Sequence, residues 1–230
     1  MNYTLVILGI VLLLVIYILY KVLDEKSRSV ASKMDLKVSN QSVAVEKTGK
    51  ADSTRYYIST WIYVNNLADI ASGTPIYKLE KSSTSPPTKY LELLLTSSAV
   101  LQYKILDANS QVQSYTIMSN FPLQKWVNII LSVDNDIVDL YIDGKLIRSH
   151  KVENRIQQIS KTGTNIIFGS PVDAYLAKME RQPKAMDPTN AWNKYMEGNG
   201  GNYFSRMFAN YGGNFTLTKD DLDVQEFKLF

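Results

Sequence analysis

The sequence predicts an all-β fold, a two-sheet antiparallel jelly-roll sandwich, with one N-terminal transmembrane helix and one short helix near the C-terminus. Residues 1–23 form a single long apolar run. From Arg55 to Met179, short segments alternate apolar and polar residues and are separated by turn residues at about the 8–12-residue spacing of sandwiches. Asp187-Pro188 then places a preferred N-cap residue before a proline at the first helical position.

The run 1–23 predicts a helix that crosses a membrane. Tyr3 to Tyr20 contains no charged residue and no proline, and about eighteen to twenty helical residues at ~1.5 Å each cover roughly the 30 Å of a bilayer core. Two alternatives are a buried soluble helix and a cleaved signal peptide, but the run is too long for a signal peptide and nothing before Leu5 is charged. The expected anchor residues, with tyrosines at both interfaces, are Tyr3, Leu5, Leu12, Ile16, Tyr17, Tyr20 and Lys21.

Composition excludes several classes of chemistry. The chain has 230 residues, a net charge of +3, no cysteine and one histidine, His150. Disulfides, iron–sulfur clusters, thiolate zinc sites and cysteine nucleophiles are therefore excluded, and the lack of disulfides favours a reducing compartment. No dense Lys/Arg stripe with interleaved aromatic residues is present, so we expect no nucleic-acid partner.

The residues that follow the apolar run predict its orientation. Only the α-amine precedes the run, whereas basic residues follow it at Lys21, Lys26, Arg28 and Lys33. The positive-inside rule then places the C-terminal domain on the cytosolic side of the membrane. Residues 24–50 are polar and rich in Ser and Lys, and predict a membrane-proximal linker in which 36–39 and 42–45 alternate weakly. Residues 51–230 form the jelly-roll domain.

The strands of this domain are expected in a regular order. They are Arg55–Val64, Thr74–Glu80, Tyr90–Thr96, Val100–Leu106, Gln113–Met118, Trp126–Val133, Val138–Ile142, Lys145–Val152, Asn165–Gly169, Ala174–Met179 and Val224–Phe230. Asp143-Gly144 predicts a tight type I′ hairpin turn, because both of its residues must adopt a positive φ. Both faces of 55–64 are apolar or aromatic, so this strand is expected to be central and covered on both sides.

Residues 186–215 combine the helix with a Gly-rich aromatic segment. The segment is too rich in glycine to form a core of its own, and exposed aromatic residues mark interfaces. Its candidate partner-binding residues are Tyr203, Phe204, Phe208, Tyr211 and Phe215. The alternative is that they cover one open end of the sandwich. Trp61 and Trp126 are expected in the core, and Trp192 is expected to pack against the sheet.

Several segments between Tyr57 and Met186 resemble the concanavalin A-like, laminin-G-like jelly rolls. They are YYISTWIYVNN, KWVNIILSVDNDIVDLYIDGKLI, IIFG and DAYLAKMERQPKAMDP, in this order. With the N-terminal apolar run, the stretch NAWNKYMEGNGGN resembles a group of membrane-anchored jelly-roll proteins of large icosahedral DNA viruses of algae and amoebae. This second resemblance implies a minor capsid protein of the virion internal membrane, which derives from host membrane, with lipid and other capsid proteins as partners.

Catalytic and metal sites are not expected. The family includes retaining β-glucanases, which need two carboxylates about 5 Å apart. The nearest match, 221–226 (DLDVQE), begins with Asp and lies close to the C-terminus, so we interpret it as a surface turn. Four acidic residues could bind calcium but also suit tight turns; they are Asp134, Asp136, Asp139 and Asp143. His150 is expected to be exposed and without a catalytic role.

These observations favour a non-enzymatic structural virion protein that links the internal membrane to the capsid shell through its jelly roll. The alternative is a membrane-anchored, lectin-like module with a glycan as its ligand, because the resembling family includes lectins. A glycosidase is the third hypothesis and would require a carboxylate pair in a cleft. No cofactor is expected, and calcium is the one ion that the acidic turns could hold.

Overall fold

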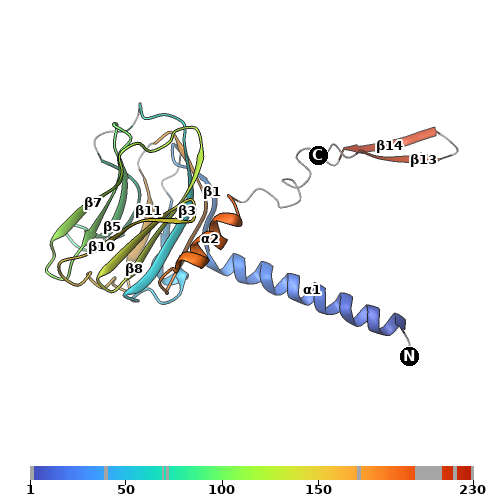
Figure 1. Cartoon of the computed structure of the whole chain (residues 1–230), viewed down its shortest axis with the longest axis horizontal. Coiled ribbons are helices and arrows are strands. Elements are labelled where there is room, and N and C mark those ends of the chain that lie inside the picture. Colours follow the sequence, from blue (N-terminus) through green and yellow to red (C-terminus); the bar gives the residue numbers. More distant parts are fainter. Residues whose placement is uncertain are drawn as a thin grey trace.

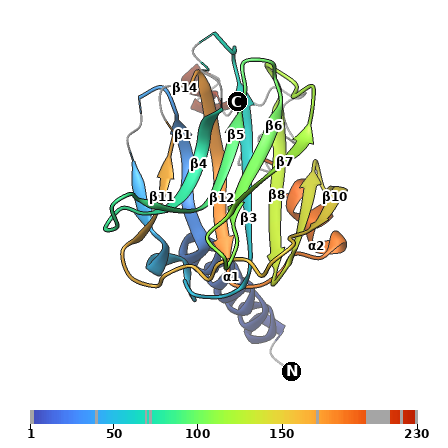
Figure 2. The same cartoon turned by 90° about the vertical axis from the view of Figure 1, so that its left-hand side faces the viewer.

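Two six-stranded antiparallel sheets pack face to face in the computed structural model of this chain (Figures 1 and 2). The structure describes residues 3–38, 41–68, 70, 73–169, 172–199, 214–219 and 222–228. The expected all-β, two-sheet sandwich is therefore confirmed.

The first sheet, sheet A, has the order β1-β12-β3-β8-β9-β10. Its strands are β1 (Ser29–Asp35), β12 (Ala174–Gln182), β3 (Arg55–Val64), β8 (Trp126–Asp134), β9 (Ile137–Ile142) and β10 (Lys145–Lys151). The expected strand 55–64 is central, as its two apolar faces predicted, and pairs with β12 on one side and β8 on the other. The β9–β10 turn has positive φ at Asp143 (48°) and Gly144 (76°), which confirms the predicted turn.

The second sheet, sheet B, has the order β2-β11-β4-β5-β6-β7. Its strands are β2 (Ser42–Ala44), β11 (Thr164–Phe168), β4 (Thr74–Lys81), β5 (Thr88–Leu95), β6 (Leu101–Leu106) and β7 (Val112–Met118). Consecutive strands β4 to β7 pair as a meander, whereas β11 reaches this sheet from the far end of the sequence.

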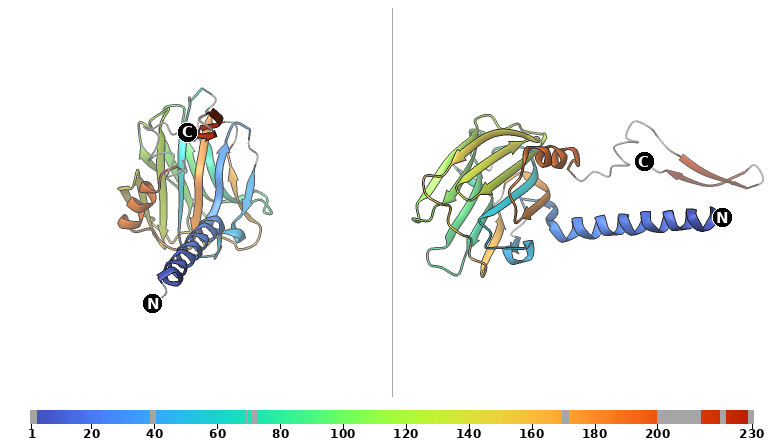
Figure 3. Two further views of the ribbon diagram at one scale, coloured as in Figure 1. Left: turned by 90° about the vertical axis from the view of Figure 1, so that its right-hand side faces the viewer. Right: turned by 60° about the horizontal axis from the view of Figure 1, so that its bottom comes forward.

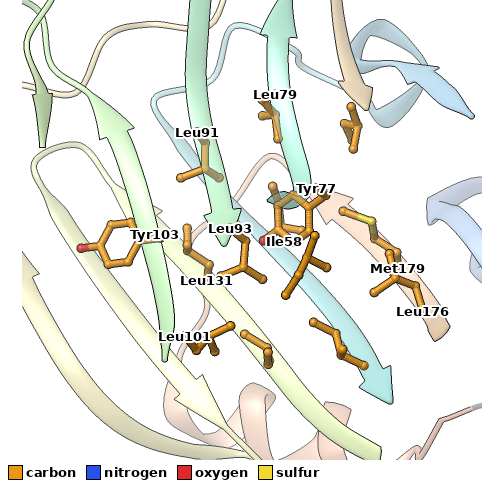
Figure 4. Close-up of a cluster of buried hydrophobic side chains, with 14 of the residues drawn as sticks. Ile58, Tyr77, Leu79, Leu91, Leu93, Leu101, Tyr103, Leu131, Leu176 and Met179 are labelled. Atoms are coloured by element: carbon orange, nitrogen blue, oxygen red, sulfur yellow. The ribbon is translucent and has the colours of Figure 1, made fainter. Parts of the chain in front are cut away.

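The core lies between the two sheets. Ile58 and Ile62 of β3 are fully buried and face the equally buried Leu91 and Leu93 of β5 across the sandwich. Figure 4 shows Ile58, Leu93 and Leu131 converging from the two layers. Burying one such side chain stabilises the fold by about 1.5–3 kcal/mol, so this layer of aliphatic residues fixes how the sheets stack.

Residues 24–50 are not the linker that the composition predicted. Strand β1 pairs with β12, and β2 pairs with β11, so both are edge strands of the sandwich. Met34 and Leu36 are buried in the core while Lys33 stays exposed. The prediction was wrong because Ser and Lys dominate the composition, whereas a few apolar residues at alternating positions suffice to pair an edge strand.

Two α-helices flank the sandwich, with a 3₁₀ turn, η1 (Val45–Thr48), near its base. Helix α1 (Tyr3–Arg28) precedes β1, and helix α2 (Pro188–Met196) follows β12. The Asp187 Oδ1 accepts a hydrogen bond from Asn190 N at 2.9 Å, so the predicted N-cap is confirmed. Within the described part of the chain, no helix meets the combined length and hydropathy expected of a membrane span.

The last strand predicted for the jelly roll belongs to neither large sheet. Strand β14 (Leu222–Lys228) pairs with β13 (Asn214–Lys219) in a two-stranded sheet of its own. Local alternation predicts that a segment is extended, but it carries no information about which strand the segment pairs with. The sandwich therefore begins at β1 and its described part ends with α2, instead of covering the whole of 51–230.

Candidate functional site: the apolar helix and the aromatic face of the sandwich

Helix α1 exposes apolar side chains on all sides. Between Val6 and Tyr20, every large apolar side chain has an exposed fraction between 45% and 68%. A helix that packs on a globular core buries one stripe and is polar opposite to it, so a helix that is apolar all round requires an apolar environment. Of the expected anchor residues, Leu12, Ile16, Tyr17 and Tyr20 are among those exposed, and Tyr3, Leu5 and Lys21 lie on the same helix.

The helix joins the sandwich without a linker. Helix α1 ends at Arg28, and β1 begins at Ser29, which pairs in register with Glu180 of β12. Figure 1 shows α1 leaving the sandwich on the side of sheet A and α2, away from β5 and β7 of sheet B. Figure 3 shows the same relationship with the outer surface of sheet A turned towards the viewer behind α1.

Six aromatic side chains, four on the outer surface of sheet A and two on α2, form a surface that we call the aromatic face. Tyr63 contacts Trp126 (ring centroids 5.5 Å apart) and Tyr175 (6.4 Å), so that one row crosses β12, β3 and β8. Two residues away on β3, the Trp61 ring stacks on Tyr195 of α2, and Tyr195 contacts Trp192. The aromatic face thus comprises Trp61, Tyr63, Trp126, Tyr175, Trp192 and Tyr195.

Helix α2 is held on this face by a second, small core. The core consists of five buried residues on sheet A, on α2 and on the segment before it: Tyr57, Ile130, Tyr141, Met186 and Ala191. Backbone polar groups of the segment are also satisfied, since Met186 N donates to Ser132 Oγ at 2.9 Å. The C-terminal part of α2 packs over the β9–β10 turn, where a Cβ added to Gly144 would lie 3.0 Å from Tyr195 Cβ.

A cluster of hydrogen-bonded and ion-paired side chains joins the same helix to sheet A. The Tyr57 hydroxyl donates to Glu180 Oε1 at 2.8 Å, and Lys194 Nζ lies 3.1 Å from Glu180 Oε2 and 2.9 Å from Glu197 Oε2. Burial alone would lower the pKa of Lys194, but the carboxylates of Glu180 and Glu197 outweigh it and raise that pKa above its usual value. Lys194 therefore stays charged, and it ties α2 to β12.

Part of α2 nevertheless remains exposed. Ala191 and Tyr195 face the sheet, whereas Trp192 and Met196, also four residues apart, are 44% and 62% exposed. Leu146 of the neighbouring edge strand β10 is 48% exposed. A tryptophan, a methionine and a leucine therefore expose apolar surface on α2 and on the neighbouring edge strand.

The sequence of residues 37–180 matches the family model of the concanavalin A-like lectin/glucanases superfamily. The chain belongs to this superfamily. The jelly-roll resemblance is thereby confirmed over most of the sandwich. No curated protein sequence matches the chain.

Solved structures with a similar fold include binding domains of botulinum neurotoxins and of Paraclostridial Mosquitocidal Protein 1. The binding domain of botulinum neurotoxin serotype D has a TM-score of 0.55 and 14% identity, covering 73% of this chain and 43% of that one. The binding domain of Paraclostridial Mosquitocidal Protein 1 has a TM-score of 0.54 and 15% identity, covering 71% and 42%. This chain thus spans less than half of these domains, and identities this low establish the fold alone.

The tryptophans expected in the core have a different place in this superfamily member. Trp61 is buried and Trp126 is half-buried, but both lie on the outer surface of sheet A instead of between the sheets. Alternation cannot distinguish the two faces of a strand when both are apolar, so the expected burial is confirmed for Trp61, beneath α2, but was wrong for Trp126. Of the candidate partner-binding residues, Tyr203, Phe204, Phe208 and Tyr211 lie outside the described residues, and Phe215 lies on β13.

Three of the four acidic residues that suited calcium, Asp134, Asp136 and Asp143, have protein partners. Asp134 Oδ1 pairs with Arg55 Nε at 2.9 Å, Asp136 pairs with Lys151 at 3.9 Å, and Asp143 Oδ1 accepts from Asn128 N at 2.9 Å. Within the described ranges, no three His, Cys, Asp or Glu side chains group as metal ligands would. In the 221–226 motif, Asp223 and Glu226 lie on β14, outside both large sheets.

Sequence reasoning missed two buried carboxylates on the outer surface of sheet B. Glu80 pairs with Lys78 at 2.7 Å, and Glu92 pairs with Lys89 at 2.9 Å. In the sequence, a lysine lies two residues before Glu80 and three residues before Glu92, and this spacing could have indicated the two ion pairs. Because each carboxylate already has an ammonium partner, the pair is arranged for structural ion pairing and not for the acid and nucleophile roles of a glycosidase.

His150 is half-buried, contrary to the expected exposure. Its ring stacks on Tyr115 with centroids 4.6 Å apart, and its Nδ1 lies 2.9 Å from the Tyr103 hydroxyl. His150 lies on β10 of sheet A, whereas the two tyrosines lie on sheet B, so the cluster joins the two sheets at one edge. Burial, with a smaller contribution from the Arg148 cation, lowers the pKa of His150.

Proposed function

We propose that this chain is a membrane-anchored, non-enzymatic binding module, in which α1 crosses a bilayer and the sandwich docks a protein partner at the membrane surface. The observation that carries this proposal is the helix whose apolar side chains are exposed on all sides and which passes directly into β1. In water, an exposed apolar surface of this extent would drive aggregation, whereas in a bilayer it is solvated by lipid tails.

The length of the apolar stretch supports a full crossing. The exposed segment 6–20 covers about 22 Å of helix at ~1.5 Å per residue. The sequence continues it without a charge to Tyr3 on one side and with Lys21-Val22-Leu23 on the other, which brings the span to about 30 Å. Lys21 lies at the end of this span, where its ammonium can reach the headgroup layer.

The setting that we propose is the internal membrane of a virion. The jelly roll would lie on the cytosolic side during assembly, as the basic residues after the span indicate, and would then face the capsid shell. There it would act as a minor capsid component that links lipid to other capsid proteins. Support comes from the resemblance of 190–202 and of the N-terminal run to virion proteins of large DNA viruses, and from the binding role printed for the similar toxin domains.

Extraction of the full chain from membranes tests the anchor. We expect the chain to remain in the membrane pellet after alkaline carbonate and to be released only by detergent. A double substitution, Leu12→Arg with Ile16→Arg, places two charges at the centre of the span and should move the chain to the supernatant. The matched control, Ser114→Arg with Thr116→Arg on exposed β7, adds the same charges without effect. Carbonate release of the unaltered chain would contradict the anchor.

Fractionation of virions tests the partner. When detergent removes the lipid, we expect the chain to stay with the protein shell, because the sandwich and not the lipid holds it there. Quantitative release together with the lipid would contradict the capsid role while leaving the membrane anchor intact.

A glycan ligand is the second candidate function, and membership of a superfamily that includes lectins favours it. A glycan array probed with the full chain in nanodiscs distinguishes the two. A saturable signal that is lost on substitution of exposed aromatic residues would favour the glycan, and its absence would leave the protein partner as the proposed ligand.

A further inference from the structure

We infer that the aromatic face of sheet A, together with α2, rests on the same bilayer that α1 enters, so that the sandwich lies on the membrane with sheet B directed away from it. This inference rests on the proposed function, because it needs α1 to be in the membrane. It adds a second membrane contact, made by the folded domain itself, and it identifies which sheet remains accessible to a partner.

The distance between the span and the sandwich is short. Only residues 24–28 separate Leu23 from β1, and they are helical, so they add about 7 Å at ~1.5 Å per residue. The headgroup layer on each side of the hydrocarbon core is itself about 5–8 Å thick. The edge of sheet A is therefore at the outer limit of the headgroups as soon as α1 emerges, and no flexible linker allows the domain to move away.

The direction in which α1 leaves the sandwich favours the same contact. Figures 1 and 3 show α1 projecting from the face of sheet A that carries α2, at a steep angle to the strands. A helix that crosses the bilayer near its normal then turns this face towards the lipid. In the left view of Figure 3, sheet B lies behind sheet A and is therefore directed towards the opposite side.

The side chains of the aromatic face suit the headgroup layer. Tyrosine and tryptophan rings prefer the headgroup layer, where one end of the side chain is apolar and the other is wet. Half-buried Tyr63, Trp126 and Tyr175, together with exposed Trp192 and Met196, present such groups. This composition fits an interface with lipid.

Charge on the same side agrees with a membrane contact. Lys33 pairs with Ala177, whose partner across the next strand is Trp61, so Lys33 faces the aromatic side and is exposed. Lys184 is exposed in the segment that leads from β12 to α2. Lys33 and Lys184 are therefore exposed cations that anionic headgroups can reach on this side of the sandwich.

Spin labels test this contact, because the chain has no cysteine and single-cysteine variants are specific. The full chain is placed in nanodiscs with labels at Met196→Cys on α2, at Ser114→Cys on the outer surface of sheet B, and at Leu12→Cys within the span. Each label is measured for collision with oxygen, which concentrates in lipid, and with a water-soluble nickel reagent. Both Met196 and Ser114 are exposed, so neither substitution should disturb folding.

We expect the label at 196 to collide several-fold less with nickel, and more with oxygen, than the label at 114. Equal nickel collision at 196 and 114 would overturn the inference, and so would shielding of 196 from both reagents, which would indicate a protein cover such as a second copy. The label at 12 and carbonate extraction report separately on the anchor. A chain that is carbonate-resistant but has a water-exposed label at 196 retains the proposed function without this contact.

Discussion

The Trp61 ring on β3 and the Tyr195 ring on α2 lie parallel to within 22°, with centroids 5.6 Å apart. This stack joins the centre of sheet A to a helix that follows β12 in the sequence. The Glu180–Lys194 pair at 3.1 Å and the close approach of α2 to Gly144 hold the same helix at two further points. The position of α2, and with it the exposure of Trp192, therefore depends on a few identifiable contacts.

The contact between α2 and the β9–β10 turn should be sensitive to a single methyl group. In Gly144→Ala, the new Cβ would lie 3.0 Å from Tyr195 Cβ and 3.1 Å from Trp192 Cα, at a φ of 76°. We expect a loss of unfolding free energy of about 2–4 kcal/mol, from about 1–2 kcal/mol for the left-handed backbone and the rest from overpacking. Urea unfolding in detergent micelles measures the loss.

Gly73→Ala is the matched control for this substitution. Gly73 has nearly the same φ, 77°, but an added Cβ would meet nothing within 4 Å. The control should therefore lose only the unfolding free energy that the left-handed backbone costs, about 1–2 kcal/mol. If both variants lose the same free energy, the contact between α2 and the turn does not contribute to stability.

Features of this fold that depend on neighbouring residues could be predicted from the sequence, whereas features that depend on distant partners could not. The Asp143-Gly144 turn and the Asp187 cap are local, since a positive φ and an N-terminal amide need only adjacent residues. The pairing of β1 with β12 joins segments about 140 residues apart, and weak local alternation does not specify such a partner.

The bulge in β12 shows how a small local irregularity changes the candidate site. Strict alternation from Ala177 would direct Met179 outward, but Lys178 has a φ of 47°, and the register shifts between Ala177 and Glu180. Met179 therefore points into the core, and Glu180 points outward to α2. The sequence has no glycine at this position to indicate a bulge, so the Glu180–Lys194 pair could not be predicted.

Stability should decrease on acidification because of His150. Its pKa is lowered in the folded protein, so the unfolded chain binds a proton at higher pH than the folded one. Stability that is present above the unfolded pKa of about 6.5 is then lost as the pH falls below that value. His150→Phe keeps an aromatic ring against Tyr115 but cannot be protonated. The urea midpoint of this variant should therefore change less between neutral pH and pH about 5 than that of the unaltered chain.

Arg148→Gln provides a second comparison for the same cluster. Removing this cation takes away one cause of the lowered pKa, so the loss of stability on acidification should become smaller without disappearing. An unaltered acid sensitivity in His150→Phe would mean that other groups titrate, and that the cluster between the sheets has no part in it.

Calcium should leave the thermal stability unchanged. The carboxylates of Asp134, Asp136 and Asp143 are already bound to Arg55, Lys151 and the Asn128 amide. An ion would have to displace these partners, which costs more than a site with free carboxylates. We expect the same Tm by differential scanning fluorimetry in millimolar calcium and in EDTA. A Tm that rises with calcium and saturates would contradict this expectation.

Replacing the buried Arg181 side chain should lower the free energy of unfolding. It is 1% exposed, and its guanidinium donates to Thr48 Oγ1 at 3.2 Å and to the carbonyls of Lys50 at 3.4 Å and Ala51 at 3.1 Å. It also lies 4.8 Å from the centre of the Tyr56 ring. Burial raises the pKa of Tyr56 to about 12, so this ring stays neutral beneath the cation.

Two opposing effects decide the result of Arg181→Met. Removing a buried cation relieves its desolvation, but three oxygen atoms near η1 lose their donor, at about 1–3 kcal/mol for each that stays buried. Because three acceptors lose their donor and only one cation is removed from the interior, we expect the free energy of unfolding to fall by about 2–4 kcal/mol, measured by urea unfolding.

Arg181→Lys should also be destabilised, since one ammonium cannot reach acceptors arranged around a planar fork. Arg155→Met, at an exposed arginine, is the control and should change stability by less than about 0.5 kcal/mol. Equal stability of the 181 and 155 methionine variants would mean that relief of desolvation cancels the lost hydrogen bonds.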